Sequence, residues 1–134
     1  MVMGFTFEFD RKNKILLVRV EGKLTEQLLA DCYAAIRQYS VATDASVGIF
    51  DLSAVTQYSV STDFIRQLAR REPAMPDATQ RLRIIAVEDT TGYGLARMFQ
   101  IVGEPERPKL HVVRTFDEAL AALGVQSPQF EPLA

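Results

Sequence analysis

The sequence contains a single cysteine and a single histidine, and each shortage excludes a class of protein. One cysteine cannot form an internal disulfide. Cys32 lies beside apolar residues at helical spacing, on what is predicted to be the buried side of a helix. Because reactive cysteines need exposure and a cationic neighbour, we predict that Cys32 is a structural thiol and not a nucleophile.

The only histidine, His111, stands near the start of a predicted strand. Open α/β sheets usually carry their sites at the carboxyl ends of the strands, so this position is the wrong one for a catalytic histidine. The sequence also has no Gly-x-Ser-x-Gly turn, and one histidine is too few for a multi-histidine metal site. We expect no metal, no cofactor and no enzymatic activity.

The patterns of charge and hydropathy exclude two further classes. The chain has 15 Lys and Arg residues against 17 Asp and Glu residues, and its basic residues are scattered, whereas nucleic-acid-binding domains carry a basic stripe. No apolar run approaches the roughly 18 residues that a membrane span needs, and no charged start precedes an apolar leader segment. We therefore expect a cytoplasmic protein that does not bind nucleic acid.

The composition of the chain is typical of one globular domain. The 134 residues are 48% hydrophobic, which is enough apolar material for a single core. Residues 1–125 contain all the periodic segments and are predicted to form this domain. Residues 126–134 include two prolines and show no apolar period, so we expect them to form an irregular tail.

The spacing of apolar residues predicts five strands and four helices. The strands are expected at 5–9, 15–20, 47–53, 82–87 and 110–114. The helices are expected at 25–39, 61–71, 91–102 and 115–123. The order β-β-α-β-α-β-α-β-α predicts an α/β fold with a mixed five-stranded sheet, in which the first strand is antiparallel and lies at an edge.

The segment 47–62 organises the predicted fold. Its first half has the β-branched and aromatic residues of a strand buried on both faces, and it ends in Asp51 and Ser53. After a polar loop, Ser59 and Ser61 precede apolar residues at helical spacing, which is typical of a helix N-cap. Acidic and hydroxyl side chains are thus predicted at the carboxyl end of a central strand, where α/β sheets usually bind ligands.

This element order, joined to the segment 51–61, resembles the STAS domains, the family of sulphate-transporter and anti-sigma-factor-antagonist domains. In that family an Asp-Ser-Ser-Gly segment follows the strand, and a partner kinase phosphorylates its second serine. Ser61 falls at the position of that serine, while Ser59, Val60 and Thr62 stand where the family has Asp, Ser and Gly. The resemblance implies a regulatory protein-interaction domain, with a kinase or regulator as its partner, switched by phosphorylation at Ser61. A plain helix cap is the structural alternative for Ser61.

The later segment 93–99 looks like a stand-alone bacterial subfamily of STAS-like domains, which is related to the lipid-binding CRAL-TRIO fold. That resemblance implies an alternative function, a carrier or membrane-surface binder of a small apolar or amphipathic ligand. The side chains expected to line its cavity are Tyr58, Met75, Tyr93, Met98 and Phe99.

A second group of polar residues follows the fourth predicted strand. Asp89 and Thr90 are expected to share one crevice with Asp51 and Ser53, because the carboxyl ends of neighbouring parallel strands meet at one edge of the sheet. Such a crevice would suit a polar ligand. The structural alternative is that strand ends collect turn residues whatever the function.

Tyr93 and Arg97 are four residues apart and share one face of the third predicted helix. An aromatic ring and a guanidinium in this arrangement could together hold an anionic or amphipathic ligand. An ordinary solvated pair is the alternative.

The third helix also carries more apolar residues than one sheet-facing stripe requires. Its core face is expected to carry Leu95, Met98, Phe99 and Val102. Ile101 falls outside that face, and Gly92 and Gly94 weaken the first turn by about 1 kcal/mol each relative to alanine. This pattern predicts either a homodimer contact or a mobile ligand entrance at this helix.

Overall fold

The computed structural model describes residues 4–75 and 81–133, and in that part of the chain six strands and four helices form around one sheet. The strands are β1 (Phe5–Asp10), β2 (Ile15–Thr25), β3 (Val47–Ser59), β4 (Arg83–Ala86), β5 (Leu110–Val113) and β6 (Glu131–Pro132). The helices are α1 (Glu26–Thr43), α2 (Thr62–Ala69), α3 (Thr90–Val102) and α4 (Phe116–Leu123). Residues 1–3, 76–80 and 134 of the predicted domain and tail lie outside the described residues.

The strand order is β5-β4-β3-β2-β1-β6. Strands β2 to β5 are parallel to one another, and β1 runs antiparallel to β2, which confirms the predicted mixed α/β sheet. The prediction of five strands is wrong, because Glu131 of the C-terminal segment pairs with Phe9 and adds β6 beyond β1. The first strand is therefore not an edge. A two-residue strand that contains Pro132 has no periodicity to detect, and proline is tolerated there because β6 is itself an edge strand.

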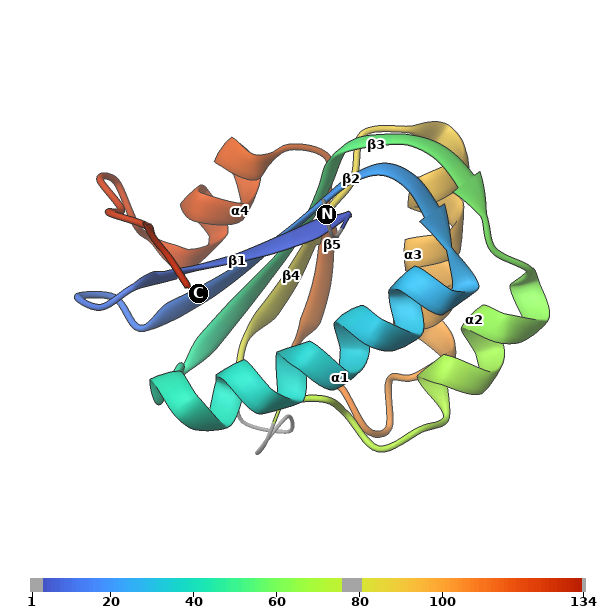
Figure 1. Ribbon diagram of the computed structural model, residues 1–134, viewed down its shortest axis with the longest axis horizontal. Coiled ribbons are helices and arrows are strands. Elements are labelled where there is room, and N and C mark those ends of the chain that lie inside the picture. Colours follow the sequence, from blue (N-terminus) through green and yellow to red (C-terminus); the bar gives the residue numbers. More distant parts are fainter. Residues whose placement is uncertain (1–3, 76–80, 134) are drawn as a thin grey trace.

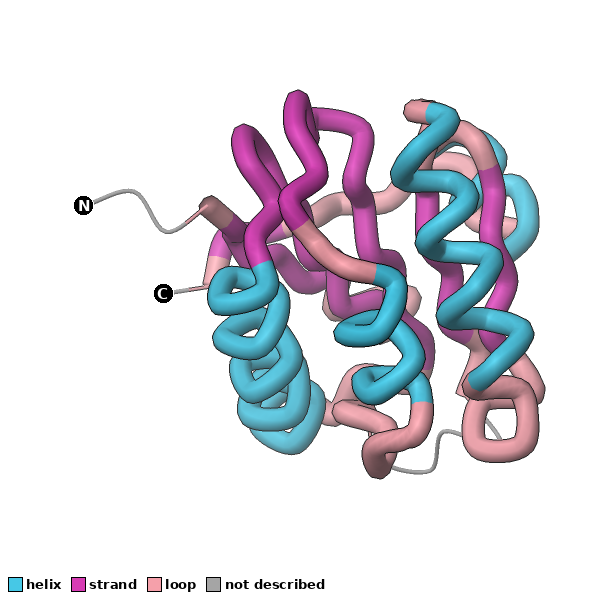
Figure 2. Tube along the Cα trace, turned by 90° about the vertical axis from the view of Figure 1, so that its right-hand side faces the viewer, coloured by secondary structure: helices cyan, strands magenta, loops and turns pink. Residues whose placement is uncertain are grey.

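Two layers of helices cover the two faces of this sheet. Helices α1, α2 and α3 lie on one face, and α4 lies on the other (Figure 1). Figure 2 looks onto the first layer and shows the short α2 between α1 and α3. Because side chains alternate along a strand, Leu52 of β3 packs with the three-helix layer while Ile49 packs with Ala119 of α4.

Strand β3 is longer than its apolar run. The expected polar loop after Ser53 is instead the second half of β3, which pairs with β2 as far as Thr25 and Ser59. Two bulges interrupt this ladder, and Gly22 beside one of them has a φ of 79°. Backbone hydrogen bonds to β2 hold the polar segment in a strand, and its side-chain pattern carries no sign of them.

Helix α1 extends beyond its expected end. It continues to Thr43 and stops at Asp44, which adopts a left-handed conformation with a φ of 58°. The helix therefore ends four residues after the expected Tyr39. The expected helix starts at Thr25, Ser61 and Thr115 are confirmed, because each side chain accepts a hydrogen bond from a first-turn N–H. The third helix begins earlier than the expected Thr91, since Asp89 is its N-cap and accepts from the backbone N–H of Gly92.

The C-terminal segment is held to the β1–β2 hairpin by the carboxylate of Asp10, which is buried. Its Oδ1 accepts hydrogen bonds from the backbone of Lys12 and Asn13, at 3.0 and 3.2 Å. Its Oδ2 accepts from the Asn13 side chain and from the backbone N–H of Gln129, at 2.7 and 3.3 Å. Burial alone would raise the pKa of Asp10, but these hydrogen bonds outweigh it and lower the pKa from its ordinary value of 3.8.

Asp10→Asn is expected to lower the free energy of unfolding by about 1–2 kcal/mol at pH 7, because an amide cannot accept the Oδ2 hydrogen bonds as a charged group does. The folded-state pKa of Asp10 is below the unfolded one. The contribution of its charge is thus present above pH 3.8 and disappears as the pH falls through the folded-state pKa. Urea unfolding between pH 2 and 7 should therefore show a smaller acid-induced loss for the variant than for wild type. Asp31→Asn, at an exposed residue, is the control, and an identical pH profile for wild type and Asp10→Asn would contradict the assignment.

Candidate functional site

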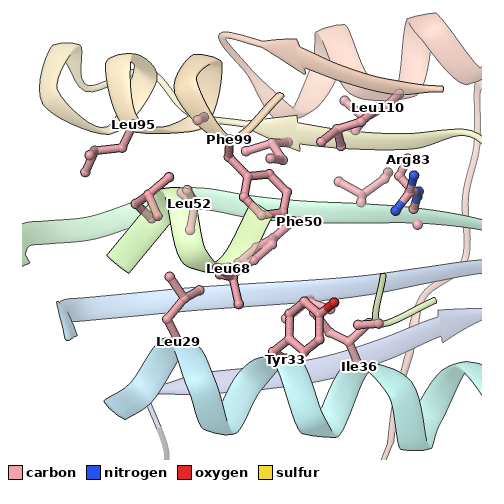
Figure 3. A pocket seen from close by; sticks show the side chains of 18 of the residues that line it. Leu29, Tyr33, Ile36, Phe50, Leu52, Leu68, Arg83, Leu95, Phe99 and Leu110 are labelled. Carbon is pink, nitrogen blue, oxygen red and sulfur yellow. The ribbon is translucent and has the colours of Figure 1, made fainter. Parts of the chain in front are cut away.

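A partly open apolar cavity of about 150 Å³ lies between the three-helix layer and the sheet. Its walls come from all three helices and from the central strands (Figure 3). They include Leu29 and Tyr33 of α1, Leu68 of α2, Phe99 of α3, and Phe50 and Leu52 of β3.

The cavity lies beneath α2, between the side chains of the helices and those of the sheet. Within the described part of the chain, α1 packs on β2 and α3 packs on β5 and β3, whereas the close neighbour of α2 is α3 and not a strand.

The structure places three of the five expected lining residues at the cavity. Tyr58, Met75 and Phe99 line it, and Tyr93 and Met98 do not. The face of α3 toward the cavity is set by Gly92, Leu95, Ala96 and Phe99, so the neighbouring residues point elsewhere. At this helix start, Gly92 allows α3 to pack closely against Tyr58.

Two arginines that sequence reasoning missed stand at one end of the cavity. Arg107 is 2% exposed, and its guanidinium donates to the carbonyls of Ala69, Leu68 and Arg71, at 2.5, 3.4 and 3.1 Å. It also donates to the Tyr33 hydroxyl at 3.2 Å and lies 4.7 Å from the centre of the Phe99 ring. These partners are neutral, so they stabilise the cation without cancelling its charge.

Arg83 of β4 lines the same end of the cavity as Tyr33 and Ile36 (Figure 3). Burial and the positive charge of Arg107 lower the pKa of Arg83 to about 10, and Tyr33 partly opposes that shift. Arg83 is a cation inside the apolar run of a predicted strand, and this position in the sequence could have indicated a buried charge. Arg107 follows the third helix between two prolines and resembles an ordinary loop residue.

Tyr58 reaches the cavity from the far end of β3, beside the start of α3. Its hydroxyl is buried and has no hydrogen-bond partner among the described residues. Burial, and then the negative charge of Asp89, raise the pKa of Tyr58 to about 12. Asp89 itself accepts a hydrogen bond from the backbone N–H of Gly92 at 3.0 Å, while Thr90 is the exposed first residue of α3.

Asp51 and Ser53 face the opposite layer of the molecule. Asp51 is 3% exposed, and its Oδ1 accepts from the backbone N–H and the hydroxyl of Ser53, at 3.0 and 2.7 Å. Its Oδ2 lies 3.6 Å from Nη1 of Arg19, whose guanidinium is 5.0 Å from the ring centre of Phe116 in α4. Because Asp89 and Thr90 begin α3 on the other face, the structure does not bring the four residues into the one crevice that we expected.

Tyr93 and Arg97 do not form the expected pair. The Tyr93 ring lies 3.6 Å from the guanidinium carbon of Arg114, next to β5. Arg97 is exposed and donates instead to the side chain of Gln100. Met98 is partly buried against the main core. Tyr93 and Arg97 therefore contact different partners.

Ser61 and Ser59 lie at the junction of β3 and α2, and both are exposed. The Ser61 hydroxyl accepts a hydrogen bond from the backbone N–H of Phe64 at 3.1 Å, so it caps α2 as its position in the sequence predicts. The backbone N–H of Ser61 donates to Oε2 of Glu26 at 2.9 Å. This bond ties the first residue of α1 to the start of α2.

Among residues 4–75 and 81–133 there is no cluster of three or more His, Cys, Asp or Glu that could hold a metal ion. Cys32 is buried, and burial raises the pKa of its thiol to about 12, which is the environment of a structural thiol. No helix in this part of the chain has the length and apolar character of a membrane span.

No family model matches the sequence. No curated protein matches it either. Solved structures do match. The anti-sigma factor antagonist SpoIIAA in its unphosphorylated form aligns at a TM-score of 0.59 and 13% identity, over 92% of this chain and 99% of that one. An anti-sigma factor antagonist from Mycobacterium paratuberculosis aligns at a TM-score of 0.52 and 19% identity, over 92% and 97% of the two chains.

These alignments cover 92% of this chain at TM-scores above 0.5, so the chain has the α/β fold of the anti-sigma-factor antagonists. In fold it is a STAS-like domain. The sixth strand, β6, is added to the five strands that the spacing of apolar residues predicted.

Proposed function

We propose that this chain is a non-enzymatic regulatory domain that binds a protein partner, and that phosphorylation of Ser61 switches the binding. The observation that carries the proposal is the exposed Ser61 hydroxyl at the start of α2, on a chain with the fold of anti-sigma factor antagonists. The partner would be a kinase or a regulator that contacts the start of α2 and the neighbouring end of β3.

The surroundings of Ser61 favour a phosphate on its hydroxyl, and they give that phosphate a way to change the surface that a partner contacts. A phosphate on its hydroxyl would lie at the positive end of the α2 dipole, where an added negative charge is favourable. The same phosphate would be close to the Glu26 carboxylate, which accepts the Ser61 backbone N–H at 2.9 Å. Repulsion between the two charges would weaken the tie between α1 and α2. The surface presented to a partner would then change without unfolding the domain.

Ser61→Asp is expected to keep the fold, because aspartate is also a good N-cap, and to weaken partner binding at least about tenfold. Ser61→Ala is expected to lose about 1 kcal/mol of stability and to keep binding. The measurement is calorimetric affinity for a partner first captured with the wild-type protein. Ser59→Asp is the matched control, since it adds the same charge two residues away at another exposed serine. Equal affinities of wild type and Ser61→Asp would contradict the switch.

A second candidate function, a carrier of a small apolar or amphipathic ligand, is favoured by the cavity beneath α2. Phe50, Leu52 and Phe99 make its wall apolar, and its volume of about 150 Å³ suits a small molecule.

The surface gives less support to a homodimer contact or to binding at a membrane surface. The exposed large hydrophobic residues of the described chain are Val41 and Ile101, one on α1 and one on α3, and two such residues form no contiguous patch.

A further inference from the structure

We infer that the cavity beneath α2 binds a small amphipathic anion, with its apolar body among the helices and its carboxylate toward Arg83 and Arg107. The inference rests on the second candidate function, the ligand carrier, and it names the chemical class of the ligand. It is independent of the proposed switch at Ser61.

The charge of the residues that line the cavity indicates that the head group of the ligand is negatively charged. Among the described residues that line the cavity, Arg83 and Arg107 are cationic, and none is aspartate or glutamate. Arg107 is buried and makes no ion pair with a described carboxylate, since its guanidinium donates to three carbonyls and one hydroxyl. A positive charge that is shielded from water and not cancelled by an acid favours an anion nearby and disfavours a cation.

The remaining walls of the cavity indicate the size and the apolar character of the rest of the ligand. Apart from the arginine end, the cavity is bounded by aliphatic and aromatic side chains from α1, α2, α3 and the sheet, with Leu29 and Leu95 at the end away from Arg83 (Figure 3). A cavity of about 150 Å³ with such walls holds a molecule of benzene size. A chain of about six carbons is therefore the length that fits.

The two ends of the cavity differ in what they offer a ligand. The arginine end offers the guanidinium groups, since the Tyr33 hydroxyl there already accepts from Arg107 at 3.2 Å and donates to the backbone carbonyl of Glu72. The other end offers the buried Tyr58 hydroxyl, next to the negative charge of Asp89. Asp89 would repel a carboxylate there, so the head group is assigned to the arginine end.

The test uses three probes of equal chain length, hexanoate, 1-hexanol and hexylamine, titrated into the purified full chain at neutral pH. Binding is followed by NMR shifts of the residues that line the cavity. Hexanoate is expected to bind at least about tenfold more tightly than 1-hexanol, and hexylamine more weakly than both. Arg83→Met should remove the preference for hexanoate and leave 1-hexanol binding unchanged. Arg97→Met removes the same charge from an exposed site on α3 and should leave the preference intact.

Leu68→Phe fills the middle of the cavity and should abolish the binding of both probes while the thermal melt stays cooperative. Leu52→Phe fills it from the sheet and replaces the first variant if that one does not fold.

Equal affinity for hexanoate and 1-hexanol would overturn the anion inference and leave the carrier function standing. No binding of either probe would overturn both. Hexanoate binding that survives a folded cavity-filling variant would place the site elsewhere and would also overturn the inference.

Discussion

Arg107→Met is expected to lower the free energy of unfolding by about 3–5 kcal/mol, the largest effect we predict for a single substitution in this domain. The methionine replaces the apolar stem of Arg107 but donates no hydrogen bond. The carbonyl of Ala69 belongs to the last residue of α2, where backbone acceptors have no partner within the helix, whereas the carbonyl of Leu68 also accepts from the backbone N–H of Arg71 at 3.1 Å. Each buried carbonyl left without a donor costs about 1–3 kcal/mol.

Urea unfolding followed by circular dichroism measures this loss, and two variants make it specific. Arg107→Lys keeps the charge but not the planar fork that reaches several carbonyls at once, so an intermediate loss is expected. Arg97→Met removes an exposed arginine and should change stability by less than about 0.5 kcal/mol. If Arg107→Met unfolds at the wild-type urea concentration, the guanidinium does not anchor α2 in the way the hydrogen bonds indicate.

Gly92→Ala is expected to destabilise the domain by about 2–3 kcal/mol, while Gly94→Ala, two residues along the same helix, is expected to stabilise it by up to about 1 kcal/mol. A Cβ on Gly92 would lie 2.2 Å from the hydroxyl oxygen of Tyr58 and 2.7 Å from Cγ2 of Val87, far inside contact distance. A Cβ on Gly94 would meet no atom within 4 Å. Helix propensity alone predicts the same gain at both positions, so the opposite signs isolate the close approach of α3 to β3.

Thermal and urea unfolding of the two alanine variants measures this contrast. Combining Gly92→Ala with Tyr58→Leu should recover part of the loss, since the smaller side chain gives the new methyl group room. Two variants that both gain stability would show that the first turn of α3 can move away from Tyr58 at little cost. The region would then be the mobile helix start that the glycines suggested.

The candidate site was predictable where the chemistry is local. The capping role of Ser61 follows from a hydroxyl three residues before a backbone N–H that needs an acceptor, and the structure places it at 3.1 Å from that N–H. The burial of Cys32 follows from its place in a helical repeat. The cap at Ser61 and the burial of Cys32 both depend on residues that are near in the sequence.

The predictions of the crevice and of the Tyr93–Arg97 pair were wrong, because they depend on contacts between distant segments. Whether Asp51 and Asp89 meet depends on which face of the sheet each side chain takes, and that depends on the register of β3 and the layer to which α3 belongs. Tyr93 pairs with Arg114, which is more than twenty residues away in the sequence and comes close only through the packing of α3 on β5. A pattern along one helix cannot show such a partner.

The sequence by itself determined the α/β class, the order of the elements from β1 to α4, the mixed sheet and three of the four helix starts. Apolar period and capping residues act over a few positions, and these features depend only on them. Tertiary structure alone decided that β6 joins the sheet, that β3 continues as a strand to Ser59, and that Arg107 is buried among the carbonyls of α2. It also decided that a cavity remains between the three-helix layer and the sheet. The reason is that hydrogen bonds and packing between distant segments leave no trace in the periodicity of either segment.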